Sequence, residues 1–205
     1  LEEERDSTEM RAMELEDKNQ ELKDALRNLQ YKTNALNKIS PASETTVDTN
    51  FLIELASQTN NPTPFECLKA IEIAFPNKCE ILDSAWESAR NMDTFQNGKR
   101  LLNLLRKLMA EYAIEIENGG DNRARMVFSS EEYSANESET VENSPSFRSK
   151  RIFNYKEKPV EMFKHLKIGK ADNISHTLRV HFAWILDEKK ILIGHCGEHL
   201  PVPSH

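Results

Sequence analysis

The chain has 205 residues, of which 38% are hydrophobic and 30% are charged, and its formal net charge is −7. This length and composition can bury one core of moderate size or two small ones and still leave polar extensions. The longest apolar runs are a few residues, far short of the roughly 20 that cross a bilayer, so we expect no membrane span. The chain has no P-loop, GxGxxG, GxSxG or HExxH motif, so nothing in it supports a nucleotide-driven motor, a dinucleotide oxidoreductase, a common serine hydrolase or a zincin protease.

The first residues and the cysteines bear on the location of the protein. The chain begins at Leu1 and shows neither the basic start nor the apolar run of a secretory signal. Its three cysteines, Cys67, Cys79 and Cys196, are an odd number without a CxxC pair, which favours a reducing compartment over a disulfide framework. We therefore expect a cytoplasmic protein, and we interpret Leu1 as the start of a fragment.

Charge is distributed unevenly along the chain. Residues 147–205 hold 11 Lys and Arg against 6 Asp and Glu and contain all six histidines, whereas the preceding residues are acidic. Such a split predicts an anionic ligand for the C-terminal part or an acidic partner, with the chain's own middle among the candidates.

Residues 1–40 predict one long helix that pairs with a second copy. Leucines recur every seven residues, and no Pro or Gly interrupts the pattern before Ser40-Pro41. Asn19 falls at an a position, where it favours a parallel dimer in fixed register. A single amphipathic helix lying on its own domain is the alternative, but the polar b, c and f positions favour the coiled coil. The predicted dimerisation residues are Leu15, Asn19, Leu22, Leu26, Leu29 and Leu36.

A helical domain is predicted to follow. Residues 41–50 are polar turn formers that predict a linker, and residues 51–128 predict a small bundle of helices. Thr63-Pro64-Phe65-Glu66 has the pattern of a capping box at the start of one helix. Apolar stripes predict further helices at about residues 78–91 and 97–117, and we interpret these stripes as the packed core of the bundle.

The last third of the chain predicts β structure. Residues 129–150 hold almost nothing that can enter a core, which predicts a flexible linker. From Arg151 the hydrophobic period changes to two, so residues 151–205 predict a basic β-rich domain with two hairpins. The expected fold class is therefore α+β, with an N-terminal coiled-coil helix, a small helical bundle and a small antiparallel C-terminal β domain.

One face of the predicted sheet is the candidate functional surface. Along residues 178–184 apolar side chains alternate with Arg179 and His181, which places these two opposite the core. A three-residue turn in the second hairpin would bring His195 directly opposite His181, and a one-residue change in the turn would separate them. The candidate nucleic-acid-binding residues are Lys164, Lys167, Arg179, His181 and His195.

Three interpretations of this set stay open. Histidines beside Lys and Arg suit the binding or the metal-free cleavage of RNA, in which one group takes the 2′-hydroxyl proton and another protonates the leaving oxygen. Residues 195–199, with His181 or His165, also offer nitrogen and sulfur ligands for zinc, but zinc sites usually show two separated ligand pairs. A solvated basic face without chemistry is the third interpretation. We assign no catalytic residue, no metal and no cofactor.

Residues 164–200 follow an order of basic leader, Arg-containing strand, acidic turn, apolar strand and Gly194-His195 end. In this order the stretch resembles the closing strands of RelE-type toxins. The resemblance implies mRNA cleavage on or off the ribosome, or gyrase poisoning in a sister branch, with basic residues on the concave face of the sheet. It also implies that Arg179 and His195 are the functional strand residues.

Two hypotheses for the function follow. In the first, a coiled-coil homodimer carries a basic β domain that binds RNA or another anionic partner such as an acidic protein, in the manner of a RelE-like toxin or an antiviral defence effector. In the second, the chain is a non-enzymatic oligomerisation or adaptor module of a larger protein assembly. Expression of a toxin is expected to arrest growth, whereas expression of an adaptor is not.

Overall fold

The computed structural model describes residues 61–169 and 173–203, all of which belong to one compact unit, Val47–His205. The predicted coiled coil of residues 1–40, with its dimerisation residues, and the predicted linker 41–50 lie outside the described residues. Within the described ranges, no helix combines the length and the hydropathy that a membrane crossing needs.

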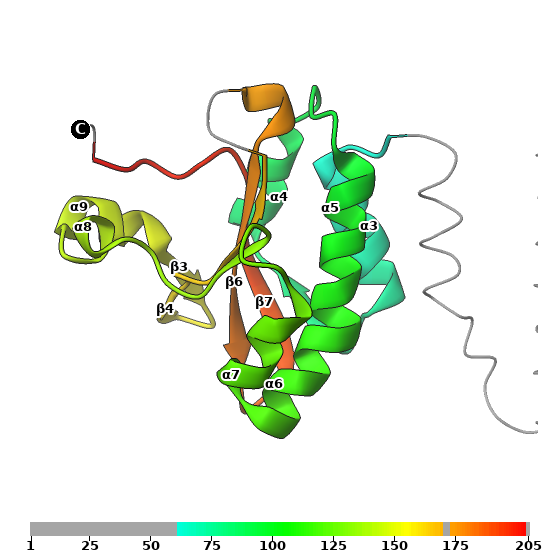
Figure 1. The fold of residues 1–205 in the computed structure, drawn as a ribbon, viewed down its shortest axis with the longest axis vertical. Coiled ribbons are helices and arrows are strands. Elements are labelled where there is room, and N and C mark those ends of the chain that lie inside the picture. Colours follow the sequence, from blue (N-terminus) through cyan, green and yellow to red (C-terminus); the bar gives the residue numbers. More distant parts are fainter. Residues whose placement is uncertain (1–60, 170–172, 204–205) are drawn as a thin grey trace, which may run out of the picture. The chain divides into compact units, whose positions relative to one another are not determined.

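Most helices precede most strands along the described chain (Figure 1). The helices and helical turns are α3 (Pro64–Ala74), α4 (Asp83–Arg90), α5 (Gly98–Lys107), the π-helical turn η1 (Leu108–Tyr112), α6 (Ala113–Gly119), α7 (Asp121–Ala124), η2 (Arg125–Val127), α8 (Glu139–Glu142), α9 (Pro145–Arg148), η3 (Ser149–Arg151) and η4 (Ile174–His176). The strands are β1 (Cys79–Ile81), β2 (Tyr133–Ser134), β3 (Ile152–Tyr155), β4 (Lys158–Glu161), β5 (His165–Ile168), β6 (Leu178–Ile185) and β7 (Lys190–Gly197).

Five of the strands form one mixed sheet in the order β1-β7-β6-β5-β2. β1 runs parallel to β7, and the other neighbours in the sheet are antiparallel. β3 and β4 form a separate two-stranded hairpin. The structure therefore confirms the mixed α+β class and the β6–β7 hairpin, while the strand β1 makes the sheet mixed rather than purely antiparallel.

The start of α3 follows the predicted capping box. The Thr63 hydroxyl accepts a hydrogen bond from the Glu66 backbone N–H, and the Glu66 carboxylate accepts one from the Thr63 N–H. The predicted helix at residues 78–91 differs, because its first residues form β1 and pair with residues 191–193 of β7. Pairing with a distant strand outweighs local helical periodicity there.

Helix α4 continues the edge of the sheet where β1 ends. Ser84 donates a hydrogen bond to the Gly194 carbonyl at 2.6 Å, and Ser88 accepts one from the Cys196 N–H at 3.0 Å. These side chains satisfy backbone groups of β7 that have no strand partner on that side. Two serines thus fix α4 against the second half of β7.

The main core lies between the helices and one face of the sheet. Figure 1 shows α3 and α5 on one side of β6 and β7. The buried apolar side chains of this core come from both halves of the described chain, with Leu105 and Met109 from the helices and Val180, Phe182 and Ile193 from the strands. The Tyr112 ring packs edge-on against Phe182, with 5.4 Å between ring centroids.

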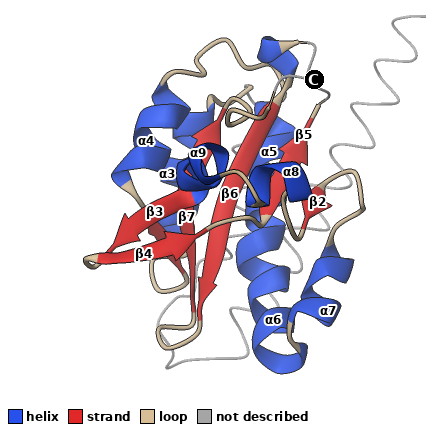
Figure 2. Cartoon of the chain, turned by 90° about the vertical axis from the view of Figure 1, so that its left-hand side faces the viewer, coloured by secondary structure: helices blue, strands red, loops and turns tan. Residues whose placement is uncertain are grey.

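The opposite face of the sheet is covered by residues 135–163. Figure 2 shows α8, α9 and the β3–β4 hairpin in front of β6 and β7, with the hairpin lying across these strands. Three fully buried apolar side chains, Val141, Met162 and Leu192, lie outside the main core. The Gly194 backbone also approaches this cover closely, because a Cβ there would lie 2.6 Å from the Met162 Sδ.

This arrangement corrects the predicted domain boundaries. The predicted helical domain 51–128 and the predicted β domain 151–205 share one core in the described residues. The predicted flexible linker 129–150 contains β2, α8 and α9, and Tyr133 and Val141 in it are buried. The segment was predicted to be flexible because its composition is polar. It is nevertheless packed, because it covers a polar sheet face, where hydrogen-bonding side chains take the place of apolar ones.

Candidate functional site

Four of the five predicted site residues lie in two rows across one sheet face, and Lys164 lies just before β5. His165, His181 and His195 are direct neighbours on β5, β6 and β7. The ring centroids of His165 and His181 are 4.8 Å apart, and those of His181 and His195 are 5.8 Å apart. Lys167 and Arg179 pair two residues further along the strands, on the same face. The predicted clustering on the face opposite the core is therefore present.

The pairing of His181 with His195 arises differently from the expected three-residue turn. Leu186 to Lys189 form a four-residue connection, because Ile185 pairs with Lys190. A bulge between His181 and Phe182 then leaves Gly194 without a pairing partner and shifts His195 to the position opposite His181.

The face is buried, which corrects the expectation that it is a solvated basic surface. Arg179 is 8% exposed and His181 1% exposed. Arg179 donates from Nη1 to the carbonyls of Ile168 and Leu178, both within its own sheet. Its Nη1 is thus used to satisfy backbone groups of the sheet, whereas its Nε is buried without a hydrogen-bond partner among the described residues.

The flanking lysines are engaged within the domain as well. Lys164 forms an ion pair with Asp121, and the Lys167 ammonium donates to the Ser130 carbonyl at 2.8 Å. His195 is partly buried, and its Nε2 donates to the Glu198 carbonyl at 2.7 Å. The five residues predicted to bind nucleic acid therefore do not form an open basic surface in the described part of the chain.

Glu137 and Arg151 complete the buried polar face. Arg151 is fully buried, and its Nε lies 2.9 Å from Glu137 Oε1. Its remaining donors reach the carbonyls of Phe147, Leu200 and Pro201. Neither residue was a sequence-based candidate, because both lie in or beside the segment read as a linker, and no local pattern distinguishes them from solvated charges.

Glu137 also approaches two of the histidines. Its Oε1 lies 4.0 Å from Nδ1 of His165 and 4.0 Å from Nε2 of His181. Burial is the main cause that lowers the pKa of His165, and it lowers the pKa of His181 to well below the usual value. Both rings are therefore neutral near pH 7, and the ion pair at this point is the one between Glu137 and Arg151.

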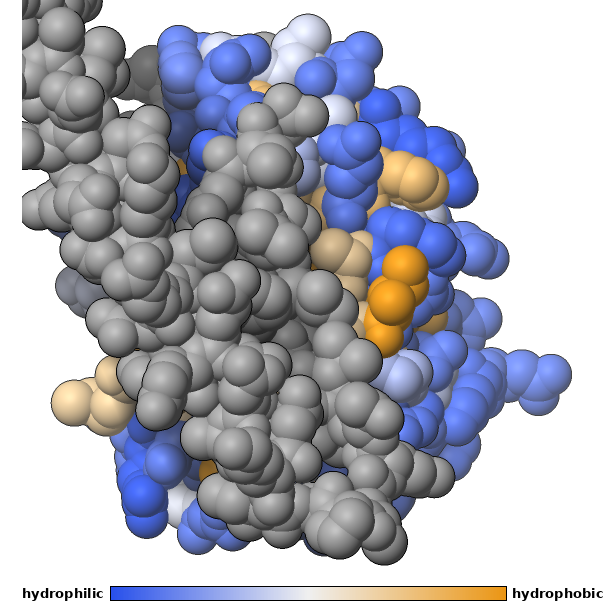
Figure 3. Space-filling model, turned by 90° about the vertical axis from the view of Figure 1, so that its right-hand side faces the viewer, coloured by the Kyte–Doolittle hydropathy of each residue, from blue (hydrophilic) through white to orange (hydrophobic). Residues whose placement is uncertain are grey.

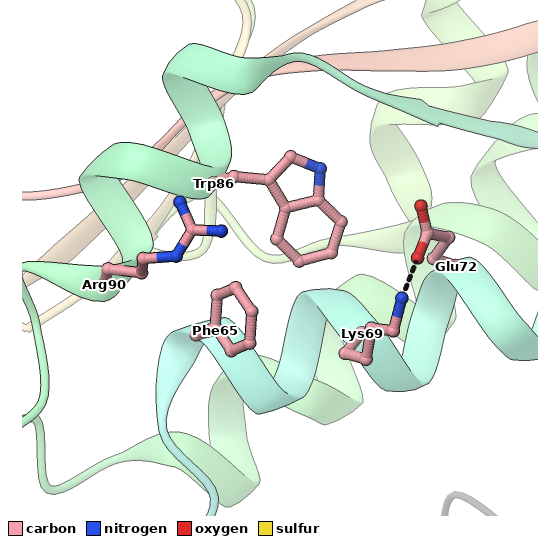
Figure 4. Close-up of a pocket in the computed structure, with 5 residues that line it drawn as sticks. All are labelled: Phe65, Lys69, Glu72, Trp86 and Arg90. Atoms are coloured by element: carbon pink, nitrogen blue, oxygen red, sulfur yellow. Dashed lines mark hydrogen bonds and ion pairs between the residues drawn. The ribbon is translucent and has the colours of Figure 1, made fainter.

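A second candidate site is a surface pocket between α3 and α4, of about 300 Å³ (Figure 4). Phe65 and Lys69 are one turn apart on α3, Trp86 and Arg90 are one turn apart on α4, and Glu72 closes the lining. The Phe65 and Trp86 rings meet edge to face, with centroids 5.3 Å apart.

Two cations border these rings. The Arg90 guanidinium lies 4.9 Å from the Phe65 ring centroid, and the Lys69 ammonium lies 5.9 Å from the Trp86 ring. Glu72 is paired with Lys69 at 2.8 Å, whereas Arg90 is exposed and forms no ion pair with any described residue. The pocket therefore combines an aromatic floor with one uncompensated guanidinium.

Sequence reasoning did not identify this pocket. It assigned the apolar stripe of residues 78–91 to the core, and the structure buries Ala85 and Ala89 but leaves Trp86 half-exposed. The i, i+4 spacing of Trp86 and Arg90 is visible in the sequence, but the position of α3 beside α4 is a tertiary feature.

The three cysteines are buried and unpaired. Burial raises the pKa of Cys67 and of Cys79 to about 12, and it raises that of Cys196 well above the usual value. Since the thiolate is the nucleophile, none of these thiols is prepared for covalent chemistry.

Comparisons of the chain with protein-family models, with curated proteins and with solved structures find no match.

Proposed function

We propose that the chain is a protein-interaction module, and that its α3–α4 pocket docks an acidic peptide segment of a partner protein. The observation that carries this proposal is Arg90, an exposed guanidinium that lies over the Phe65 ring without an ion-pair partner among the described residues. A carboxylate of the partner would fill the bidentate hydrogen-bonding capacity of this guanidinium.

The aromatic floor supports a hydrophobic contact beside that ion pair. Phe65 and Trp86 are partly buried against the core, so their positions are already fixed before a partner binds. Trp and Arg are enriched among the residues that contribute most to protein interfaces. An aliphatic or aromatic side chain next to the partner's carboxylate would cover the two rings.

The surrounding surface supports a protein rather than a small ligand. On the side of the molecule where α3 and α5 lie, hydrophobic side chains reach the surface among hydrophilic ones (Figure 3). Ile73, two turns beyond Phe65 on the same side of α3, is 69% exposed. A peptide along α3 would contact Ile73 as well as the pocket.

Self-association is the second part of the proposal. The heptad leucines of residues 1–40 predict a parallel dimer, which would present two pockets in one particle. Two linked sites raise the apparent affinity for a partner that carries two acidic segments. RNA binding remains the competing proposal, and the burial of Arg179 and His181 is the reason that we favour an adaptor.

Peptide binding to the full chain tests the pocket. The probes are peptides with Asp or Glu next to Leu, Ile or Phe, and matched peptides with Asn or Gln in place of the acids. Trp86 is one of only two tryptophans, so its fluorescence reports the pocket, and Trp184→Phe removes the other signal. We expect salt-sensitive binding of the acidic peptides alone, because exposed charges are screened at high ionic strength.

Arg90→Ala should weaken this binding about tenfold or more, as expected for the loss of a hydrogen bond to a charged group. Arg125→Ala is the matched control, since Arg125 is another exposed arginine and does not line the pocket. Equal binding of acidic and neutral peptides would contradict the proposal. Salt-sensitive binding of an RNA pool, unchanged by Arg90→Ala, would support the competing one.

A further inference from the structure

The buried polar face contains three metal-ligand side chains in close contact. One ligand atom from each of Glu137, His165 and His181 lies within 4.8 Å of the other two. The three residues come from separate parts of the chain: His165 and His181 from paired strands, and Glu137 from the segment that covers them. Two imidazoles and one carboxylate are a common protein ligand set for zinc and for other divalent transition metals.

Hydrogen bonds hold the two imidazoles in a form that can bind a metal. His165 Nδ1 lies 2.8 Å from the Phe163 carbonyl, and His181 Nδ1 lies 2.9 Å from the Met162 carbonyl. A carbonyl only accepts, so each Nδ1 carries the proton and each Nε2 keeps its lone pair. Metal-ligating histidines almost always donate their other nitrogen to such a partner.

The carboxylate is held in a similar way. Arg151 Nε donates to Glu137 Oε1 at 2.9 Å, and the buried guanidinium is itself fixed by three backbone carbonyls. A carboxylate has about four acceptor positions, so this bond leaves capacity for a metal. The outer partner of each candidate ligand is therefore present in the fold.

We propose that Glu137, His165 and His181 bind one divalent transition-metal ion, and that zinc is the ion that fits them best. In a tetrahedral zinc site neighbouring ligand atoms are about 3.4 Å apart, given metal–ligand lengths near 2.1 Å. The 4.0 Å from Glu137 Oε1 to Nε2 of His181 would close by less than about 1 Å. The 4.0 Å to His165 ends at Nδ1, so Nε2 of that ring lies no closer and has to approach the ion by a small movement of the side chain.

Burial gives this site a structural role. Glu137, His165 and His181 are each less than a tenth exposed, so a bound ion would have little contact with bulk water. The ion would connect the cover, residues 135–163, to β5 and β6. Burial also lowers the pKa of both imidazoles, which keeps them unprotonated at neutral pH as metal binding requires.

Zinc titration of the metal-free full chain tests the site. We expect one zinc ion per chain by calorimetry, a higher unfolding temperature with zinc, and a cobalt absorption spectrum typical of nitrogen and oxygen ligands. Glu137→Gln keeps an oxygen that accepts from Arg151 but removes the negative charge. It should weaken zinc binding by at least about 100-fold, because loss of a residue that only holds a metal ligand in place already costs up to about that much. His199→Gln alters an exposed histidine outside the site and should change nothing.

A measurement on the parent chain tests the site without depending on whether a variant folds. Nitrogen NMR of the histidine rings should show zinc-induced shifts at Nε2 of His165 and His181, with Nδ1 still protonated. Absence of zinc binding by the parent chain would overturn the proposal. Binding that persists in Glu137→Gln and leaves these two rings unshifted would overturn it as well.

Discussion

Both faces of the five-stranded sheet are covered, but by different chemistry. On one face Val180 and Phe182 of β6 pack against helices in the main apolar core. On the other face Arg179 and His181 of the same strand lie beneath residues 135–163, among Glu137 and other polar groups. Alternation along β6 thus assigns each side chain to a face, but it does not show whether water or protein covers the polar one.

The two faces should also respond differently to substitution. Apolar packing is non-directional, so the cost of truncation follows the volume that is removed. In a buried polar network, a substitution costs stability when it leaves a remaining polar group without its hydrogen-bond partner, whatever volume it removes. Three substitutions, from the largest expected effect to the smallest, measure this difference.

Phe182→Ala should cause the largest loss on the apolar face. The ring is fully buried and contacts Tyr112 and Tyr133, so its removal leaves a cavity. Truncation of a buried phenylalanine costs about 3–5 kcal/mol, and we expect about 4 kcal/mol in urea unfolding. A loss under about 1 kcal/mol would show that the helices do not pack on β6 as described.

Arg151→Ala should destabilise the polar face by about 3 kcal/mol, although the residue lies at the end of a 3-10 turn. The substitution leaves Glu137 buried without its cation and removes the donor to three carbonyls. The control is Arg148→Ala, which breaks the exposed ion pair with Glu161 and should cost less than about 1 kcal/mol. Equal losses in the two variants would contradict the buried network.

Gly194→Ala should have a smaller effect, about 1–3 kcal/mol, because the added methyl group would overlap the cover. Its Cβ would lie 2.6 Å from Met162 Sδ and 2.7 Å from the Phe153 ring. Met162→Ala in the same chain should offset part of this loss, since residues in contact do not act additively. Strict additivity of the two changes would show that Met162 does not contact β7 at Gly194.

Local patterns in the sequence predicted part of this fold. The capping box at Thr63 starts α3, and the period of two along residues 178–184 gives the two faces of β6. Both are short-range signals with a direct physical cause. The heptads of residues 1–40 stay a prediction, because they lie outside the described residues.

The rest depended on contacts between distant segments. Cys79–Ile81 form a strand only because β7 lies beside them, and Gly194 becomes a bulge only when β6 and β7 pair. The candidate sites depend on such contacts even more. Glu137 reaches His165 and His181 through the fold, and Trp86 forms a pocket only beside α3.

Limited proteolysis of the full chain tests most directly whether residues 129–150 are part of the domain. The segment contains five glutamates between residues 131 and 142, so a glutamate-specific protease can cut it wherever it is open. We expect no cut there until the tryptophan fluorescence of the Trp86→Phe variant, which comes from Trp184 of β6, reports unfolding, because a segment packed on the sheet opens only with the domain. Cleavage within 129–150 while the sheet stays folded would contradict the covered polar face and restore the predicted flexible linker.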